Sequence, residues 1–114
     1  MSFTELELKG IDHTVGDLCR RKTRPEHADQ LRFECQIGDN AVTMWEVRTP
    51  WDGVGDHTHM GIARFRFVRL RGEWQLYWMR QDLKCHRYEP AEPTPDLAAL
   101  VAVVEADERM AFFG

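Results

Sequence analysis

The sequence predicts an α+β domain whose four- or five-stranded antiparallel meander sheet has an N-terminal and a C-terminal helix packed on one face. Two patterns support this prediction. Apolar residues recur with the period of a helix near each end of the chain, and between them apolar and polar residues alternate with the period of strands. Short turns separate the alternating segments, as in an antiparallel meander. Of the 114 residues, 43% are hydrophobic and 30% charged, so residues 1–114 are expected to form a single domain.

The first element is a helix with a well-marked start. Thr4 and Glu7 have the spacing of a capping box, which predicts that the helix begins at Glu5. Pro25 cannot continue a helix, so we expect the end near residues 22–23. Apolar residues between these limits recur at steps of three and four and should form one buried stripe: Leu8, Ile11, Val15 and Leu18.

The central elements are strands. We expect them at 31–37, 41–48, 62–69 and 74–79, with 85–89 either extending the fourth strand or adding a short fifth. The helices should cover a face made of large apolar side chains: Phe33, Trp45, Phe65, Phe67, Leu76 and Trp78. The open face should then carry mostly charged side chains: Arg32, Glu34, Glu46, Arg48, Arg64, Arg66 and Tyr77.

The remaining segments are loops, a closing helix and an apolar tail. Proline and glycine among polar residues predict a long loop at 49–60, and Gly72 predicts a turn. Thr94 has the place of a helix cap and Pro95 that of the first helical residue. The stripe that this last helix should bury is Leu97, Leu100, Val101 and Val104. The tail at 110–113 is apolar and should dock on the body or on a second copy.

Composition and charge restrict the classes of protein to which the chain can belong. No run approaches about eighteen apolar residues and the first residues do not resemble an export signal, so we expect a cytoplasmic protein without membrane spans. The 3 cysteines lack CxxC spacing, which favours reduced thiols. The net charge of -4 argues against a protein that coats nucleic acid. Charge is nevertheless uneven, since residues 62–90 carry seven basic and three acidic side chains.

One long motif resembles the signature of a family of small bacterial proteins classed as a domain of unknown function. The matching residues are Trp74, Leu76, Tyr77, Trp78, Arg80, Asp82, Leu83, Lys84, His86 and Tyr88. Further matches are Val42, Glu46, Val47, Arg48 and Trp51, with Phe112, Phe113 and Gly114 at the end. The resemblance implies a bacterial origin and one whole domain, and it implies no activity. The chain departs from the pattern at Cys85, where we expect an aromatic residue.

The same segment mixes rings with cations and is therefore the best candidate for a binding site. The planar guanidinium group of arginine can donate two parallel hydrogen bonds to phosphate oxygens, and aromatic rings stack on planar ligands. We therefore expect a small binding domain for an anionic or planar ligand such as nucleic acid or a nucleotide. The residues predicted to bind it are Arg48, Arg64, Arg66, Tyr77, Arg80, Lys84, His86 and Arg87. The ordinary alternative is that the tryptophans are core residues and that the arginines pair with neighbours such as Glu34 and Glu46.

Three other functions compete with this interpretation. A dimeric protein-interaction module could associate as a homodimer through the apolar tail or an edge strand. A small ribonuclease-like enzyme could use His86 as a base beside cations, although the acidic net charge argues against it. A metal site could combine His57, His59, Cys85 and His86, but their spacing matches no zinc pattern. We therefore expect neither a metal nor a cofactor.

Overall fold

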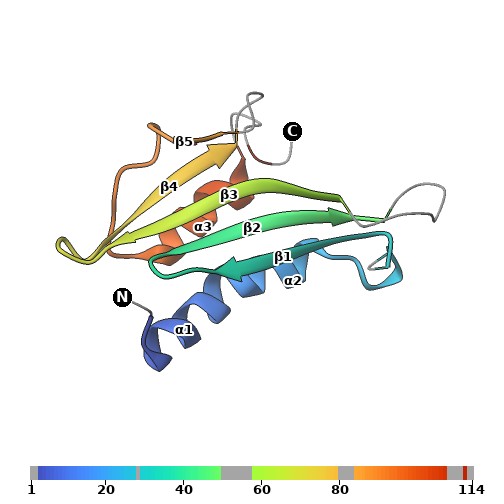
Figure 1. Ribbon diagram of the computed structural model, residues 1–114, viewed down its shortest axis with the longest axis horizontal. Helices are drawn as coiled ribbons and strands as arrows, with labels where there is room; N and C mark the ends of the chain where they lie inside the picture. Colours follow the sequence, from blue (N-terminus) through green and yellow to red (C-terminus); the bar gives the residue numbers. More distant parts are fainter. Residues whose placement is uncertain (1–2, 28, 50–57, 80–83, 108–111, 113–114) are drawn as a thin grey trace.

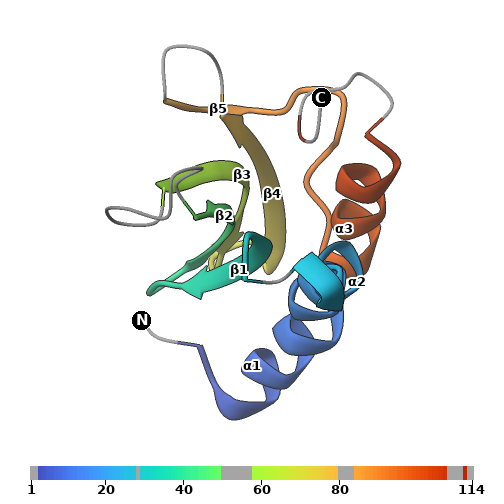
Figure 2. The same ribbon diagram turned by 90° about the vertical axis from the view of Figure 1, so that its right-hand side faces the viewer.

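The computed structural model describes residues 3–27, 29–49, 58–79, 84–107 and 112. They form one antiparallel sheet with strand order β1-β2-β3-β4-β5, and all helices lie on one side of it (Figures 1 and 2). The strands are β1 (Leu31–Ile37), β2 (Ala41–Arg48), β3 (Thr58–Val68), β4 (Glu73–Met79) and β5 (Cys85–Arg87). The helices are α1 (Glu5–Ile11), α2 (Asp17–Lys22) and α3 (Leu97–Ala106). The predicted α+β meander is confirmed, with a separate fifth strand.

The N-terminal helical segment begins at Glu5 and ends at Lys22, as the sequence predicts, but a π-helical turn divides it into α1 and α2. The Thr4 hydroxyl accepts a hydrogen bond from the Glu7 backbone N–H at 3.2 Å, and the Glu7 carboxylate accepts one from the Thr4 N–H at 2.9 Å. These two bonds are the predicted capping box. A π-helical turn at Asp12–Gly16 joins α1 to α2, and Thr23 ends α2. The Thr14 hydroxyl donates to the Gly10 carbonyl at 2.7 Å beside this turn.

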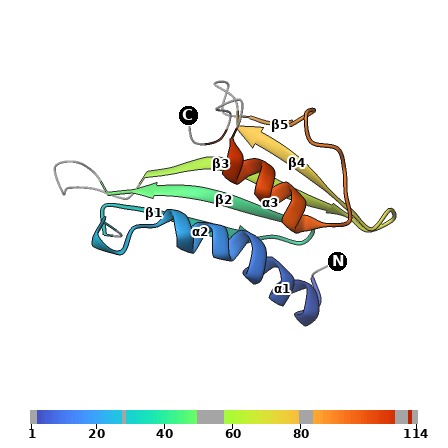
Figure 3. The same cartoon turned by 180° about the vertical axis from the view of Figure 1, so that it is seen from behind.

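Both ends of the chain bury their apolar stripes against the sheet. Ile11, Val15 and Leu18 are at most 2% exposed, whereas Leu8 is 37% exposed and lies outside the stripe. All four predicted residues of α3 are buried: Leu97, Leu100, Val101 and Val104. In space α2 lies against β1, whereas α3 lies against β3 and β4 (Figure 3).

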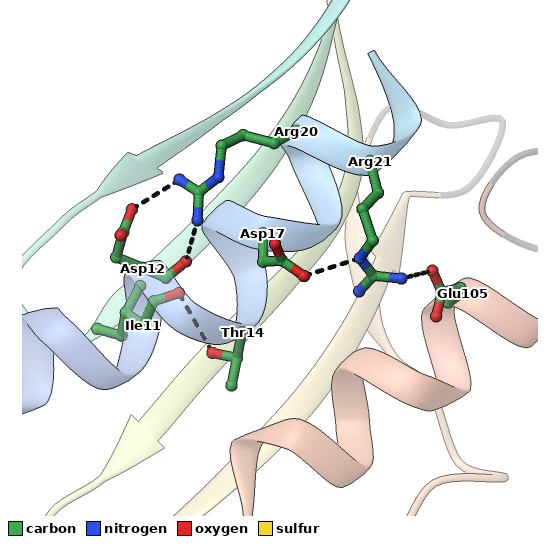
Figure 4. A network of polar contacts seen from close by, with 7 residues as sticks. All are labelled: Ile11, Asp12, Thr14, Asp17, Arg20, Arg21 and Glu105. Carbon is green, nitrogen blue, oxygen red and sulfur yellow. Dashed lines mark hydrogen bonds and ion pairs between the residues drawn. The ribbon is translucent and has the colours of Figure 1, made fainter. Parts of the chain in front are cut away.

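Ion pairs on the outer surface connect the helices to one another. Arg21 of α2 donates to Asp17 at 2.8 Å and also pairs with Glu105 of α3 (Figure 4). Arg20 pairs with Asp12 at 2.9 Å across the π-helical turn. Because these side chains are partly exposed to water, the pairs orient the helices more than they stabilise the fold.

The sheet buries a different set of β2 residues from the predicted one. Val42 and Met44 are fully buried under the helices, and Val42 stands opposite Phe65, which stands opposite Leu76. Trp45 was expected in this covered face, and that prediction is wrong. It faces the open side, because β2 carries apolar residues in both of its alternating sets and only the pairing with β3 selects one of them.

In the C-terminal part, the residue that caps α3 differs from the predicted one, and one residue of the predicted tail is seen to pack on the core. Asp96 caps α3 by accepting from the Ala98 N–H at 3.1 Å, and the Thr94 hydroxyl accepts from the Asp96 N–H. Thr94 therefore precedes the cap instead of forming it. Phe112 is 6% exposed and packs on Tyr88 with ring centroids 5.0 Å apart, so this part of the tail docks on the body. The rest of the tail lies outside the described residues.

Two further predictions concern loops and membranes. The long loop was expected to end at residue 60, but β3 already begins at Thr58. The remainder of that loop, 50–57, lies outside the described part of the chain. Gly72 has a φ of 62° and forms the predicted turn between β3 and β4. No helix in the described ranges is long and apolar enough to cross a membrane.

Candidate functional site

A row of side chains crosses the open face through three neighbouring strands. Arg64 of β3 stands opposite Thr43 of β2 on one side and opposite Tyr77 of β4 on the other. Tyr77 in turn stands opposite Arg87 of β5. Residues that oppose each other in an antiparallel pair project from the same face. The open face therefore carries a tyrosine ring between two guanidinium groups.

A small hollow lies at the centre of this row. Its volume is about 170 Å³, and its lining residues are Arg64, Arg66, Tyr77 and Cys85. Both arginines are exposed to solvent, and Tyr77 is partly buried. The Tyr77 hydroxyl donates a hydrogen bond to the Gln75 side-chain oxygen at 3.1 Å, which fixes the ring against the sheet. We call Arg64, Arg66, Tyr77 and Arg87 the basic patch.

The arginines of the basic patch lack a carboxylate partner among the residues that the structure describes. Within the described ranges no ion pair involves Arg64, Arg66 or Arg87. Arg32, on the same open face, shows the alternative in which a surface arginine pairs with a neighbouring carboxylate, because it donates to Glu34 at 2.7 Å. An exposed cation without a carboxylate partner is free to pair with an anionic ligand.

The structure separates Arg48 from the basic patch. Arg48 forms an ion pair with Glu46, whose side chain is only 13% exposed. On β1 the partners of these two residues are Leu31 and Phe33, and Phe33 packs on the core. Glu46 and Arg48 therefore project toward the helix side at the end of β2, and their predicted place on the open face is wrong. The reason is the same as for Trp45: Glu46 and Arg48 belong to the alternating set of β2 side chains that faces the helices.

The strand β5 also divides its residues between the two faces. His86 stands opposite Trp78, which packs against the core, so His86 projects toward the helix side. Arg87 projects to the open face. Tyr88 is 6% exposed and is a core residue. The histidine that the ribonuclease hypothesis requires therefore lies on the other face from the basic patch. Lys84 is exposed just before β5, and Arg80 lies outside the described residues.

A second hollow occupies another part of the open face. It has a volume of about 520 Å³, and its lining residues are Glu34, Cys35, Gln36, Trp45 and His59. The Trp45 and His59 rings meet edge to face with centroids 6.5 Å apart. The Trp45 indole N–H donates to the Gln36 side-chain oxygen at 3.0 Å, so the ring is held at the surface. We call this the aromatic hollow.

Sequence reasoning missed the aromatic hollow and the place of Cys85. Trp45 was assigned to the core, and His59 was considered only as a metal ligand. The signal that could have found the hollow is Gly61, which stands opposite Trp45. A Cβ atom at Gly61 would lie 2.6 Å from the end of Met79 and 3.6 Å from the indole of Trp45. A glycine in a strand often marks such a close approach.

The predicted metal ligands do not form a site in the part that the structure describes. No three His, Cys, Asp or Glu side chains of these residues come together in a way that could hold a metal ion. Cys85 faces the basic patch, whereas His86 projects to the opposite face. His57 lies outside the described residues.

Fold and surface together define a small α+β domain with one helix-covered and one open sheet face, and the open face bears exposed arginines that form no ion pair with any residue that the structure describes. The chain belongs to the family described as Domain of unknown function (DUF3024), whose model matches residues 3–114. No curated protein and no solved structure matches it. The predicted resemblance to a domain of unknown function is thereby confirmed at the level of an uncharacterised domain family.

Proposed function

We propose that this chain is a cytoplasmic, bacterial binding domain that holds single-stranded nucleic acid, or a nucleotide of the same chemistry, on its open sheet face. One observation carries the proposal: Arg64 and Arg66 are exposed beside Tyr77 and make no ion pair among the described residues. Guanidinium groups match phosphate oxygens, and the neighbouring ring offers a surface on which a base can stack.

The aromatic hollow supports a single strand over a duplex. Trp45 and His59 present rings on the same face as the basic patch. A base can stack on such rings only when it is not already stacked within a double helix. The net charge of -4 makes long-range attraction weak, so binding should be modest and sensitive to salt.

Charge reversal at the basic patch tests the proposal. Arg64→Glu/Arg66→Glu should abolish the anisotropy change of a fluorescently labelled oligonucleotide, whereas wild-type protein binds it. The matched control is Arg24→Glu/Arg71→Glu, which changes the net charge equally at two exposed positions outside the patch. The control should retain binding. Circular dichroism verifies that both variants are folded.

The salt dependence gives a second readout of the same contacts. Each phosphate contact to a single strand contributes about 0.7 to the slope of log affinity against log salt. Replacing Arg64 and Arg66 singly by Gln should therefore lower the slope by about that amount for each residue. Identical binding curves for wild type and Arg64→Glu/Arg66→Glu, or equal loss in the control, would refute the proposal.

A further inference from the structure

Two cysteines from different elements face each other between α2 and β1. Cys19 of α2 is 4% exposed and belongs to the core, and Cys35 of β1 packs against that core from the sheet. The Thr23 hydroxyl connects the two elements, because it donates to the Cys19 carbonyl at 2.9 Å and accepts from the Phe33 N–H at 2.9 Å. Cys35 lies two residues beyond Phe33 in the strand and so projects from the same face.

The two thiols have unequal acidity. A hydrogen bond from the Cys19 thiol holds the pKa of Cys35 below the usual value for a thiol, although burial opposes this shift. The same hydrogen bond, together with burial, raises the pKa of Cys19. Of the charged side chains that act on the Cys35 pKa, Asp12 raises it and Arg20 lowers it. Cys35 is therefore the thiolate of the pair, and Cys19 is its proton donor.

Cys35, the more acidic of the two thiols, is also the more accessible to solvent. Cys35 is only partly buried, whereas Cys19 is 4% exposed and enclosed by the core. The third cysteine, Cys85, lies in β5 at the opposite edge of the sheet from β1. An oxidant from solvent therefore reaches Cys35 first, and Cys19 is the thiol that stands next to it.

We propose that Cys19 and Cys35 form a reversible redox pair that closes to a disulfide between α2 and β1 on reaction with a hydroperoxide. The Cys35 thiol releases its proton to solvent, and the resulting thiolate attacks one oxygen of hydrogen peroxide. The O–O bond breaks to give a sulfenic acid and hydroxide, which takes up a proton from solvent in place of the one released and becomes the first water. The Cys19 sulfur then displaces the sulfenic hydroxyl, which leaves with the Cys19 proton as a second water. Two thiols are oxidised by two electrons and one peroxide is reduced. A thiol reductant reverses the reaction.

Peptide mapping of the full-length wild-type chain tests the pair directly. Trypsin separates the three cysteines into the peptides 10–20, 33–48 and 85–87. The folded, reduced protein is treated with hydrogen peroxide, the peroxide is removed, and the protein is then unfolded in the presence of N-ethylmaleimide so that every free thiol is blocked. The blocked protein is digested and analysed by mass spectrometry. We expect the peptides 10–20 and 33–48 to be joined and to separate after dithiothreitol. The peptide 85–87 should not join either of them.

Two variants separate the roles of the cysteines. In Cys19→Ala/Cys85→Ser, Cys35 should give a sulfenic acid that dimedone traps, because its partner is absent. In Cys35→Ser/Cys85→Ser, the buried Cys19 should resist peroxide and react with maleimide only after unfolding. The proposal is overturned if maleimide labels both Cys19 and Cys35 when the peroxide-treated wild-type protein is unfolded, or if the two cysteines join only when peroxide is added in denaturant. The wild-type map decides this even if a variant fails to fold.

Discussion

Phe3 stacks on Trp74 with ring centroids 5.6 Å apart and ring planes 16° apart. Phe3, which precedes α1, and Trp74, the first tryptophan of β4, thereby form one wall of the core, to which Phe67 adds a third ring 4.9 Å from Trp74. The stack explains why Trp74 is only 7% exposed although it begins the aromatic and basic motif. Within that motif Trp74 and Tyr88 are structural, whereas Tyr77 reaches the open face.

Trp74→Ala should therefore destabilise the protein strongly. Removing a buried ring of this size leaves a cavity and should lower the free energy of unfolding by about 3–5 kcal/mol. Urea denaturation followed by circular dichroism measures the loss. Tyr77→Phe is the control within the same strand, because it removes one hydroxyl that hydrogen-bonds to Gln75 and leaves the ring in place. A loss below about 1 kcal/mol for Trp74→Ala would contradict the ring stack.

The docked Phe112 predicts how the tail contributes to stability and assembly. Its ring packs on Tyr88, and its N–H donates to the Asp107 carboxylate at 3.0 Å. Phe112→Ala should lower the free energy of unfolding by about 3 kcal/mol without changing the molar mass measured by light scattering. A smaller mass for the variant would instead show that Phe112 joins two copies, as the interaction-module hypothesis requires.

Two glycines should respond oppositely to the same substitution. Gly10 lies in α1, and no atom comes within 4 Å of the place that an added methyl group would take, so Gly10→Ala should stabilise the protein by about 0.5–1 kcal/mol. Gly72 has a φ of 62°, which a side chain disfavours, so Gly72→Ala should destabilise by about 1 kcal/mol. Thermal unfolding of the two variants side by side measures both signs. Equal shifts would contradict the turn geometry.

The capping box predicts a loss of stability in acid. The Thr4 N–H, and after it the Arg69 guanidinium at 3.2 Å, hold the pKa of Glu7 below its ordinary value of 4.5. A carboxylate with a lowered pKa stabilises the fold above its unfolded-state pKa, and this contribution disappears as the pH falls through the folded-state value. Wild type should thus exceed Glu7→Gln in Tm at pH 7, and the two should converge in acid.

A matched variant controls for charge in the same turn. Glu5→Gln removes one carboxylate from the start of α1 but leaves the hydrogen bonds between Thr4 and Glu7 intact. Its Tm at pH 7 should fall less than that of Glu7→Gln. Equal decreases for both variants would mean that the general field at the helix start, and not the capping box, makes the difference.

Local patterns in the sequence determined several elements without help from the rest of the fold. Thr4 and Glu7 predicted the start of α1, and Gly72 predicted the turn, because capping and turn formation involve residues only a few positions apart. The buried stripe of α3 followed from its own periodicity for the same reason. The order of strands followed from short connections, which restrict successive strands to neighbouring places.

Only the tertiary structure decided which surfaces these elements share. Both alternating sets of β2 contain apolar residues, so its periodicity could not choose between burying Trp45 and burying Met44. Pairing with β3 made that choice, and a register shift between Met44 and Trp45 accompanies it. The surroundings of Arg64 and Arg66, where no described carboxylate forms an ion pair with either residue, likewise depend on elements distant in the chain. So does the approach of Cys19 to Cys35. Such contacts are set by strand register and helix docking, which a single segment does not encode.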